Sequence, residues 1–185
     1  DFEEIKQLIQ DQVSNQFIGV KASVTMGPLR SIRVFVLGDV VSPGSYTVSS
    51  LSSLTNALLA SGGVKRIGSL RNIALKRDGE TVTTLDLYDL LLEGDTSGDV
   101  RLQPGDVIHV PTIGPTVGIA GQVQRPAIYE LEDDTTVGRI LDLAGGLNPG
   151  ADRAHVRLHR RTPSGEETVL DLDLSQDGVR SRTVK

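Results

Sequence analysis

Histidines, carboxylates and a cluster of arginines are the side chains of this 185-residue sequence whose spacing could support chemistry. His155 and His159 are four residues apart, a spacing that brings two ligands to one metal ion on a helix. The surrounding pattern predicts a strand instead, and four strand residues span about 13 Å. Because both histidines alternate with Val156 and Leu158, we expect exposed strand histidines and no metal site.

Carboxylates are a second candidate, since a pair of them can cleave a glycoside as acid and base. The residues considered for such a pair are Asp39, Asp106, Asp133 and Asp134. Asp106 follows a Pro-Gly turn and the last two precede a predicted helix, so local structure explains them. The sequence has no cysteine, no G-x-S-x-G elbow, no P-loop and no dinucleotide-binding glycine motif. We therefore expect no enzyme, no catalytic residue and no bound cofactor.

An arginine cluster makes one stretch of the sequence locally basic, and it consists of Arg153, Arg157, Arg160 and Arg161. One interpretation is a contact surface for an anionic polymer of sugar acids or for an acidic neighbouring subunit. The other is a solvated edge strand that its charges protect from aggregation, which is the more common role of such runs. The sequence leaves both open and favours the second.

Composition excludes several function classes. The chain has 19 Lys and Arg against 24 Asp and Glu, a net charge of −5, so we expect no nucleic-acid partner. It has 20 glycines, 3% aromatic residues and no Trp, which favours many short strands and tight turns over an aromatic platform for sugars. No run approaches the ~18 apolar residues of a membrane-spanning helix.

The first 26 residues predict a helix followed by a strand. Asp1 and Glu4 have the spacing of a capping box for a helix over residues 1–15. Its apolar stripe consists of Ile5, Leu8, Ile9 and Val13. Apolar and polar residues then alternate from Val20 to Met26, which predicts a half-buried strand that ends at Gly27-Pro28.

An internal repeat is the most informative feature of the sequence. A shift of 83 residues aligns ten identical residues across positions 34–77 without a gap. The pairs are Val34/Val117, Gly38/Gly121, Val40/Val123, Pro43/Pro126, Tyr46/Tyr129, Leu58/Leu141, Gly62/Gly145, Gly63/Gly146, Leu75/Leu158 and Arg77/Arg160. We infer a tandem duplication.

Each copy predicts a strand with an internal glycine, a hairpin, one helix and two more strands. Tyr46 and Tyr129 are expected in the hairpin or the core. The helix is expected to be capped by Ser50 or Ser52 in the first copy and by Asp133 or Asp134 in the second. The expected helix stripes are Leu54, Ala57, Leu58 and Ser61, and Val137, Ile140, Leu141 and Ala144. The Gly-Gly pairs predict left-handed helix ends, and the later turns fall at Asp78-Gly79 and Pro163-Ser164-Gly165.

A closing strand distinguishes the two copies. The first copy ends in Leu102–Pro111, where Pro104-Gly105 suits a type II turn before an apolar strand. The second copy reaches Leu174 without such a strand. The order of elements predicts an α+β fold in which one helix covers a mixed sheet, as in a β-grasp.

The repeat motifs carry a resemblance to a known family. The segments RVFVLGDVVSPGSYTV…LTNALLASGG and VGIAGQVQRPAIYEL…VGRILDLAGGLNPGA, with LQPGDVIHVP closing the first, resemble SLBB domains, the soluble ligand-binding β-grasp. The arrangement is similar to the Wza-like outer-membrane polysaccharide export family. The resemblance implies the C-terminal part of an export signature domain at 1–30, a first SLBB domain at 31–112 and a second at 113–185.

What the resemblance implies is a non-enzymatic, periplasmic role in the export of capsule or exopolysaccharide. The expected partners are identical subunits in a ring, the polysaccharide itself and an inner-membrane polysaccharide co-polymerase. The front half of the signature domain, the lipid-bearing cysteine and the C-terminal amphipathic helix of the family are not in the sequence. We therefore expect a fragment, whose full-length form associates with the outer membrane through regions absent from this chain.

Two alternatives remain. A soluble periplasmic protein that binds a glycan or another ligand through the same domains would be a monomer with a pocket between the repeats. An enzyme acting on the glycan would need two carboxylates about 5–10 Å apart.

Overall fold

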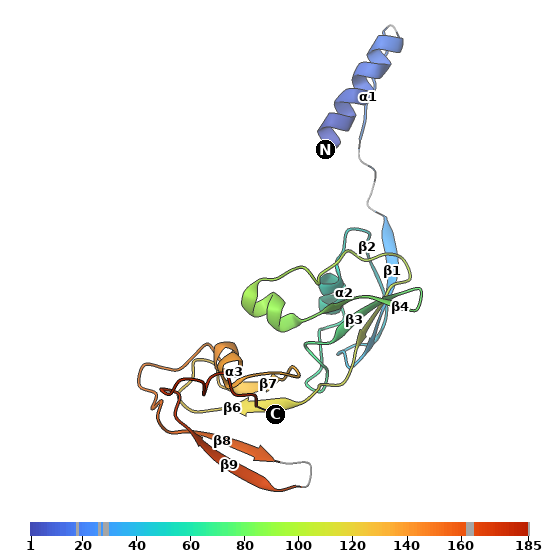
Figure 1. The fold of residues 1–185 in the computed structure, drawn as a ribbon. Coiled ribbons are helices and arrows are strands. Elements are labelled where there is room, and N and C mark those ends of the chain that lie inside the picture. The colour runs from blue at the N-terminus through green and yellow to red at the C-terminus, as the bar shows by residue number, and fades with distance from the viewer. Residues whose placement is uncertain (18, 26, 28–29, 162–164, 185) are drawn as a thin grey trace. The chain divides into compact units, whose positions relative to one another are not determined.

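The computed structural model describes residues 1–185 apart from 18, 26, 28–29, 162–164 and 185. The chain divides into two compact units, Asp1–Ser31 and Ile32–Lys185. Groups of strands, paired mostly antiparallel, are separated by single helices along it (Figure 1), which confirms the α+β class.

Helix α1 (Phe2–Gln16) dominates the first unit, and both halves of the predicted capping box between Asp1 and Glu4 are present. The predicted strand at Val20–Met26 is wrong for residues 20–25, which pair with no strand in the described part of the chain. Alternation marks a face, but a strand also needs a hydrogen-bonded neighbour. Met26 and Pro28 of that prediction lie outside the described residues.

The first repeat forms one mixed sheet. Its strands are β1 (Ser31–Gly38), β2 (Gly44–Ser49), β3 (Ile73–Arg77), β4 (Glu80–Leu85) and β5 (Val107–Val110), in the order β2-β1-β5-β3-β4. The closing strand β5 is central, because it runs parallel to β1 and antiparallel to β3. Asp78 and Gly79 have positive φ in the β3–β4 turn, as the sequence predicts.

One helix of each repeat presents the predicted stripe to the core. Helix α2 (Leu54–Ala60) buries its four stripe residues, and α3 (Val137–Leu143) does the same with its own. The Gly-Gly pairs that follow have φ between +77° and +87°, as expected of left-handed helix ends. The predicted caps are wrong, since α2 is capped by Ser53 and α3 by Thr136.

The repeat tyrosines make the same contact in both copies. The Tyr46 hydroxyl donates to the carbonyl of Ser42, and the Tyr129 hydroxyl donates to the carbonyl of Arg125 at 2.7 Å. Each tyrosine therefore closes its hairpin, as predicted.

A short π-helix, η1 (Asp89–Glu93), is a feature that the sequence does not indicate. It lies in the connection from Leu85 to Leu102, which is longer than the matching connection from Leu172 to Val184. The extra length has no counterpart in the second repeat, so the internal alignment could not reveal it.

The second repeat consists of two separate hairpins on α3. Its strands are β6 (Thr116–Ile119), β7 (Ala127–Glu130), β8 (Val156–Arg161) and β9 (Glu167–Leu172). β6 pairs with β7 and β8 with β9, but no described strand joins the two hairpins. Pro163 and Ser164 of the predicted β8–β9 turn lie outside the described residues.

Burial differs accordingly between the two copies. Val36 and Leu75 have no exposed surface in the first repeat, whereas their counterparts Ile119 and Leu158 are half-buried. The difference follows from β5, which covers these positions in the first repeat.

Candidate functional site at the junction of the repeats

The arginine cluster does not form a single surface. Arg153 and Arg157 are exposed, while Arg160 is half-buried and donates to the carbonyls of Thr183 and Val184 at 3.3 and 3.0 Å. The backbone of Arg161 belongs to β8, and its side chain lies outside the described residues.

The histidines and carboxylates have separate local partners. His155 and His159 are exposed, as predicted, and lie 2.8 Å from Asp152 and 3.4 Å from Glu167. The hydrogen bond with His155 and that from the Ala154 amide lower the pKa of Asp152.

The aspartates proposed as a glycosidase pair are also dispersed. Asp106 is fully buried against Arg77, and Asp39 accepts a hydrogen bond from Thr112 at 2.9 Å. Asp133 and Asp134 are exposed ahead of α3. The four aspartates therefore occupy separate places in the fold and do not form the acid–base pair considered from the sequence.

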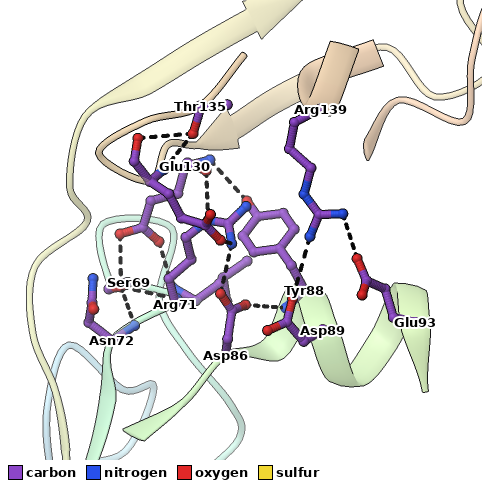
Figure 2. A network of polar contacts seen from close by, with 12 residues as sticks. Ser69, Arg71, Asn72, Asp86, Tyr88, Asp89, Glu93, Glu130, Thr135 and Arg139 are labelled. Atoms are coloured by element: carbon purple, nitrogen blue, oxygen red, sulfur yellow. Dashed lines mark hydrogen bonds and ion pairs between the residues drawn. The ribbon is translucent and has the colours of Figure 1, made fainter. Parts of the chain in front are cut away.

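A buried glutamate at the junction of the repeats was not predicted from the sequence. Glu130 ends β7 of the second repeat, and only 1% of its surface is exposed. Its carboxylate accepts from the Ser69 hydroxyl at 2.8 Å and from the Leu70 and Gly114 amides at 2.9 Å each. Two of these donors belong to the first repeat (Figure 2). These three hydrogen bonds replace those that the carboxylate would make to water, as a buried charge requires.

Arg71 crosses the same junction from the first repeat. Its side chain is 4% exposed, and its Nε donates to the backbone carbonyl of Glu130 at 2.9 Å. Its Nη1 pairs with Asp86 at 2.7 Å and with Glu132 of the second repeat. Two carboxylates thus converge on one guanidinium, which favours a structural ion cluster over an acid–base pair.

Tyr88 adds aromatic contacts to the junction. The Arg71 guanidinium lies 4.3 Å from the centre of its ring, a cation–π distance, and the Tyr129 ring lies 6.2 Å away. The Tyr88 hydroxyl accepts from the amide of Glu130 at 3.0 Å. Burial raises the pKa of Tyr88, outweighing the effects of that hydrogen bond and of Arg71.

The rim of the junction is formed by η1 and α3. Arg139 of α3 pairs with Glu93 and lies 3.5 Å from Asp89 (Figure 2). The hydrogen bond to Glu93 raises the pKa of Arg139, and burial beside Asp86 and Glu93 raises that of Asp89. These half-exposed pairs add little stability individually.

The junction is suited to fixing geometry. An apolar pocket of about 160 Å³ lies beside it, and its lining includes Leu70, Leu87, Tyr88 and Tyr129. A pocket of this size is below the roughly 300–1,000 Å³ of typical ligand sites. With its buried groups satisfied, the network holds the two repeats in one arrangement.

One sequence signal could have located this junction. Among the positions where only one of the aligned copies carries a charge are Arg71, which aligns with Ala154, and Glu130, which aligns with Thr47. A charged residue that only one copy carries is free to serve contacts between the copies.

Comparison with known proteins supports the duplicated architecture. Residues 32–110 and residues 116–171 each match the SLBB domain family. Two Escherichia coli proteins named polysialic acid transport protein KpsD are 27% identical to the chain over 159 residues. The aligned region is 85% of this chain and 27% of each relative, so the chain spans about a quarter of their length. The two matches together cover most of the chain, which therefore belongs to the SLBB domain family and carries two such domains in tandem, in a sequence similar to that of the polysialic acid transport protein KpsD.

Proposed function

We propose that this chain is the periplasmic, non-enzymatic part of a protein that exports capsular or extracellular polysaccharide across the outer membrane. In this proposal residues 1–30 end an export signature domain, and residues 31–112 and 113–185 are two SLBB domains. Identical subunits form a ring whose wall includes the paired SLBB domains.

The observation that carries the proposal is the buried junction of Arg71 and Glu130. A ring with a conduit requires each subunit to keep a fixed shape, because the angle between neighbours decides whether the ring closes. A buried polar network whose groups all have hydrogen-bond partners supplies that rigidity, because movement of one domain against the other would break those bonds.

The surface chemistry is compatible with a sliding polymer. The chain has no Trp, so it offers few of the stacking contacts that hold sugars tightly. Its net charge of −5 gives no general attraction for an acidic polymer. The exposed Arg153 and Arg157 are the candidate contacts with an acidic polymer or with a neighbouring subunit. An inner-membrane polysaccharide co-polymerase is the partner that would deliver the polymer.

Among the described residues, no helix is long and apolar enough to cross a bilayer. Independently of that finding, the proposal includes association of the full-length protein with the outer membrane through regions other than this chain.

The proposal can be tested by complementation in cells that lack their own polysaccharide exporter. The longer natural protein should restore surface polysaccharide and form a closed ring in detergent, seen by electron microscopy. Glu130→Gln should reduce the amount of polysaccharide exported per molecule of folded protein, and the exposed control Arg66→Gln should not. A monomer that binds the acidic oligosaccharide at micromolar affinity would contradict the conduit and support the soluble binding protein.

A further inference from the structure

The sheet of the first repeat has two apolar faces, of which α2 covers one. Neighbours in register point to the same side of a sheet, and successive residues of a strand point to opposite sides. Val36 and Ile108 are register neighbours without exposed surface, and both belong to the core that α2 covers. Phe35, Leu37 and Val107 therefore lie on the other side, which we call the open face. Phe35 and Leu37 are 38% and 40% exposed there.

The two copies of the repeat differ on this face. Its apolar positions in the first copy align with small or charged residues in the second, namely Phe35 with Gly118, Leu37 with Ala120 and Ala74 with Arg157. The covered face stays apolar in both copies, as Val34 and its counterpart Val117 illustrate. A repeat can thus fold without an apolar open face. Large apolar side chains that the fold does not require, and that are left half-exposed, are typical of a docking surface.

The open face is basic around its apolar centre. Among the described strand residues, the ionisable side chains on this face are those of Arg33, Lys76 and His109. Lys76 and His109 are the register neighbours of Val107 and Leu37. Packing two such faces against each other would bring like charges together. The face therefore favours a partner surface that is both apolar and acidic.

Helix η1 exposes two leucines on the opposite side of the same repeat. Leu91 and Leu92 are 73% and 41% exposed. Leu87 and Leu90 pack against the core between the sheet and α2, so η1 lies on the α2 side of the sheet (Figure 1). One copy therefore cannot bring its own η1 to its own open face. Like the apolar open face, η1 has no counterpart in the second repeat.

Acidic side chains accompany the exposed leucines of η1. Three carboxylates lie within a few residues of them in the sequence, those of Asp89, Glu93 and Asp95. Arg139 pairs with the first two and Arg125 lines the pocket beside the leucines, so part of this charge is offset. Asp95 is exposed and has no ion-pair partner in the described part of the chain, where its carboxylate accepts from Ser97. The surface of η1 is thus apolar with an acidic edge, as the open face requires.

We propose that the open face of one copy binds η1 of a second copy. The leucines of η1 pack on the apolar centre of the face, and its carboxylates face Arg33 and Lys76. Because the two surfaces lie on opposite sides of the repeat, each copy can bind two others, which is the heterologous contact that builds rings. The inference rests on the proposed assembly of identical subunits and names the surfaces through which they meet.

Sedimentation of the chain over a range of concentrations tests the contact. The natural chain should form species larger than a dimer, because a dimer keeps one free surface of each kind. Phe35→Thr and Leu91→Gln should each weaken the association about tenfold or more. Ile128→Thr is the control, since Ile128 is 69% exposed and belongs to neither surface. A natural chain that stays monomeric at about 1 mM would overturn the second copy as the occupant.

A mixture of the two variants separates complementary surfaces from a folding defect. Phe35→Thr keeps η1 and Leu91→Gln keeps the open face, so the mixture should form a dimer that neither variant forms alone. Such a dimer also shows that both variants are folded. Leu37→Thr with Leu92→Gln repeats the test at neighbouring positions should the first pair unfold. Folded variants whose mixture stays monomeric would overturn the pairing of the open face with η1.

Lys76 tests the choice of an acidic partner. Lys76→Gln should weaken the association several-fold, and Lys76→Glu should weaken it further, because the reversed charge would face the carboxylates of η1. Raising the salt concentration from about 50 to 500 mM should weaken the association of the natural chain more than that of Lys76→Gln. Equal association of the three chains would overturn η1 as the partner, since the open face would then not select an acidic surface.

The longer natural protein distinguishes this inference from the proposed function. Its ring should dissociate in Phe35→Thr and persist in Ile128→Thr. A ring that persists in both variants would overturn the contact and leave the proposed function standing. A natural protein that forms no ring would count against the proposed function, whatever the variants of this chain do.

Discussion

The carboxylate of Glu130 accepts a hydrogen bond of 2.8 Å from the hydroxyl of Ser69, a residue of the other repeat. Both residues are buried, at 1% and 0% exposure. The contact joins two domains that the sequence presents as copies of each other, and it is central to their coupling.

Replacing Glu130 by Gln should destabilise the junction. The amide group of Gln would face one of the donors that the carboxylate now accepts, so we expect a loss of about 2–4 kcal/mol of unfolding free energy. Urea denaturation measures the loss. Glu132→Gln is the control, because its side chain is 51% exposed, and it should cost less than about 1 kcal/mol. Equal costs for the two variants would contradict the importance of burial here.

Arg71→Lys should uncouple the two repeats. Lysine keeps the charge but cannot donate at once to the Glu130 carbonyl, Asp86 and Glu132 with the geometry of a guanidinium. We expect a loss of about 2–3 kcal/mol and a calorimetric transition that broadens or splits in two. Arg66→Lys, at an exposed position, should leave a single transition. A sharp, unshifted transition in Arg71→Lys would show that the repeats are coupled by other contacts.

The glycine pair offers a comparison within one molecule. Gly38→Ala should cost more than about 3 kcal/mol, since it combines a positive φ with overlap onto the Val110 carbonyl. Gly121→Ala has the same backbone strain without the overlap and should cost about 1–2 kcal/mol. Thermal or urea unfolding of the two variants gives the difference. Similar values would mean that strain alone controls both positions.

Alkaline pH should weaken the junction through Tyr88. Its pKa is raised in the folded state, so the folded chain holds the phenolic proton more tightly than the unfolded chain. The associated stability is present below the unfolded pKa of about 10 and is lost as the pH rises above it. Urea midpoints measured on both sides of pH 10 should fall more steeply for the natural chain than for Tyr88→Phe. Identical slopes would assign the loss to other groups.

Most of the fold within each copy follows from local sequence. Helix stripes, Gly-Gly ends and hairpin turns depend on neighbours a few residues away, and the duplication presents each pattern twice. The helix caps illustrate the limit of this reasoning. Ser53, and not Ser50 or Ser52, caps α2 because Asp99 accepts from the Ser53 hydroxyl at 2.9 Å and from the Thr55 amide at 2.8 Å. That selection depends on a residue 46 positions later.

The candidate site was not predicted for the same physical reason. Arg71, Tyr88 and Glu130 come together only when the two repeats pack, and no local pattern marks them. The strand expected at Val20–Met26 illustrates the opposite case, in which a local pattern is present but the structure is not. Apolar and polar residues alternate there, but alternation does not ensure a neighbouring strand with which the backbone can pair.

The asymmetry of the junction limits how these modules can be strung together. The first repeat supplies Arg71 and η1, and the second supplies Glu130 and Arg139. Neither repeat carries the other's half, since Ala154 and Thr47 occupy the matching positions of Arg71 and Glu130. The junction therefore gives the pair a direction, because exchanging the order of the two repeats would place neither the guanidinium nor the buried carboxylate opposite its partner.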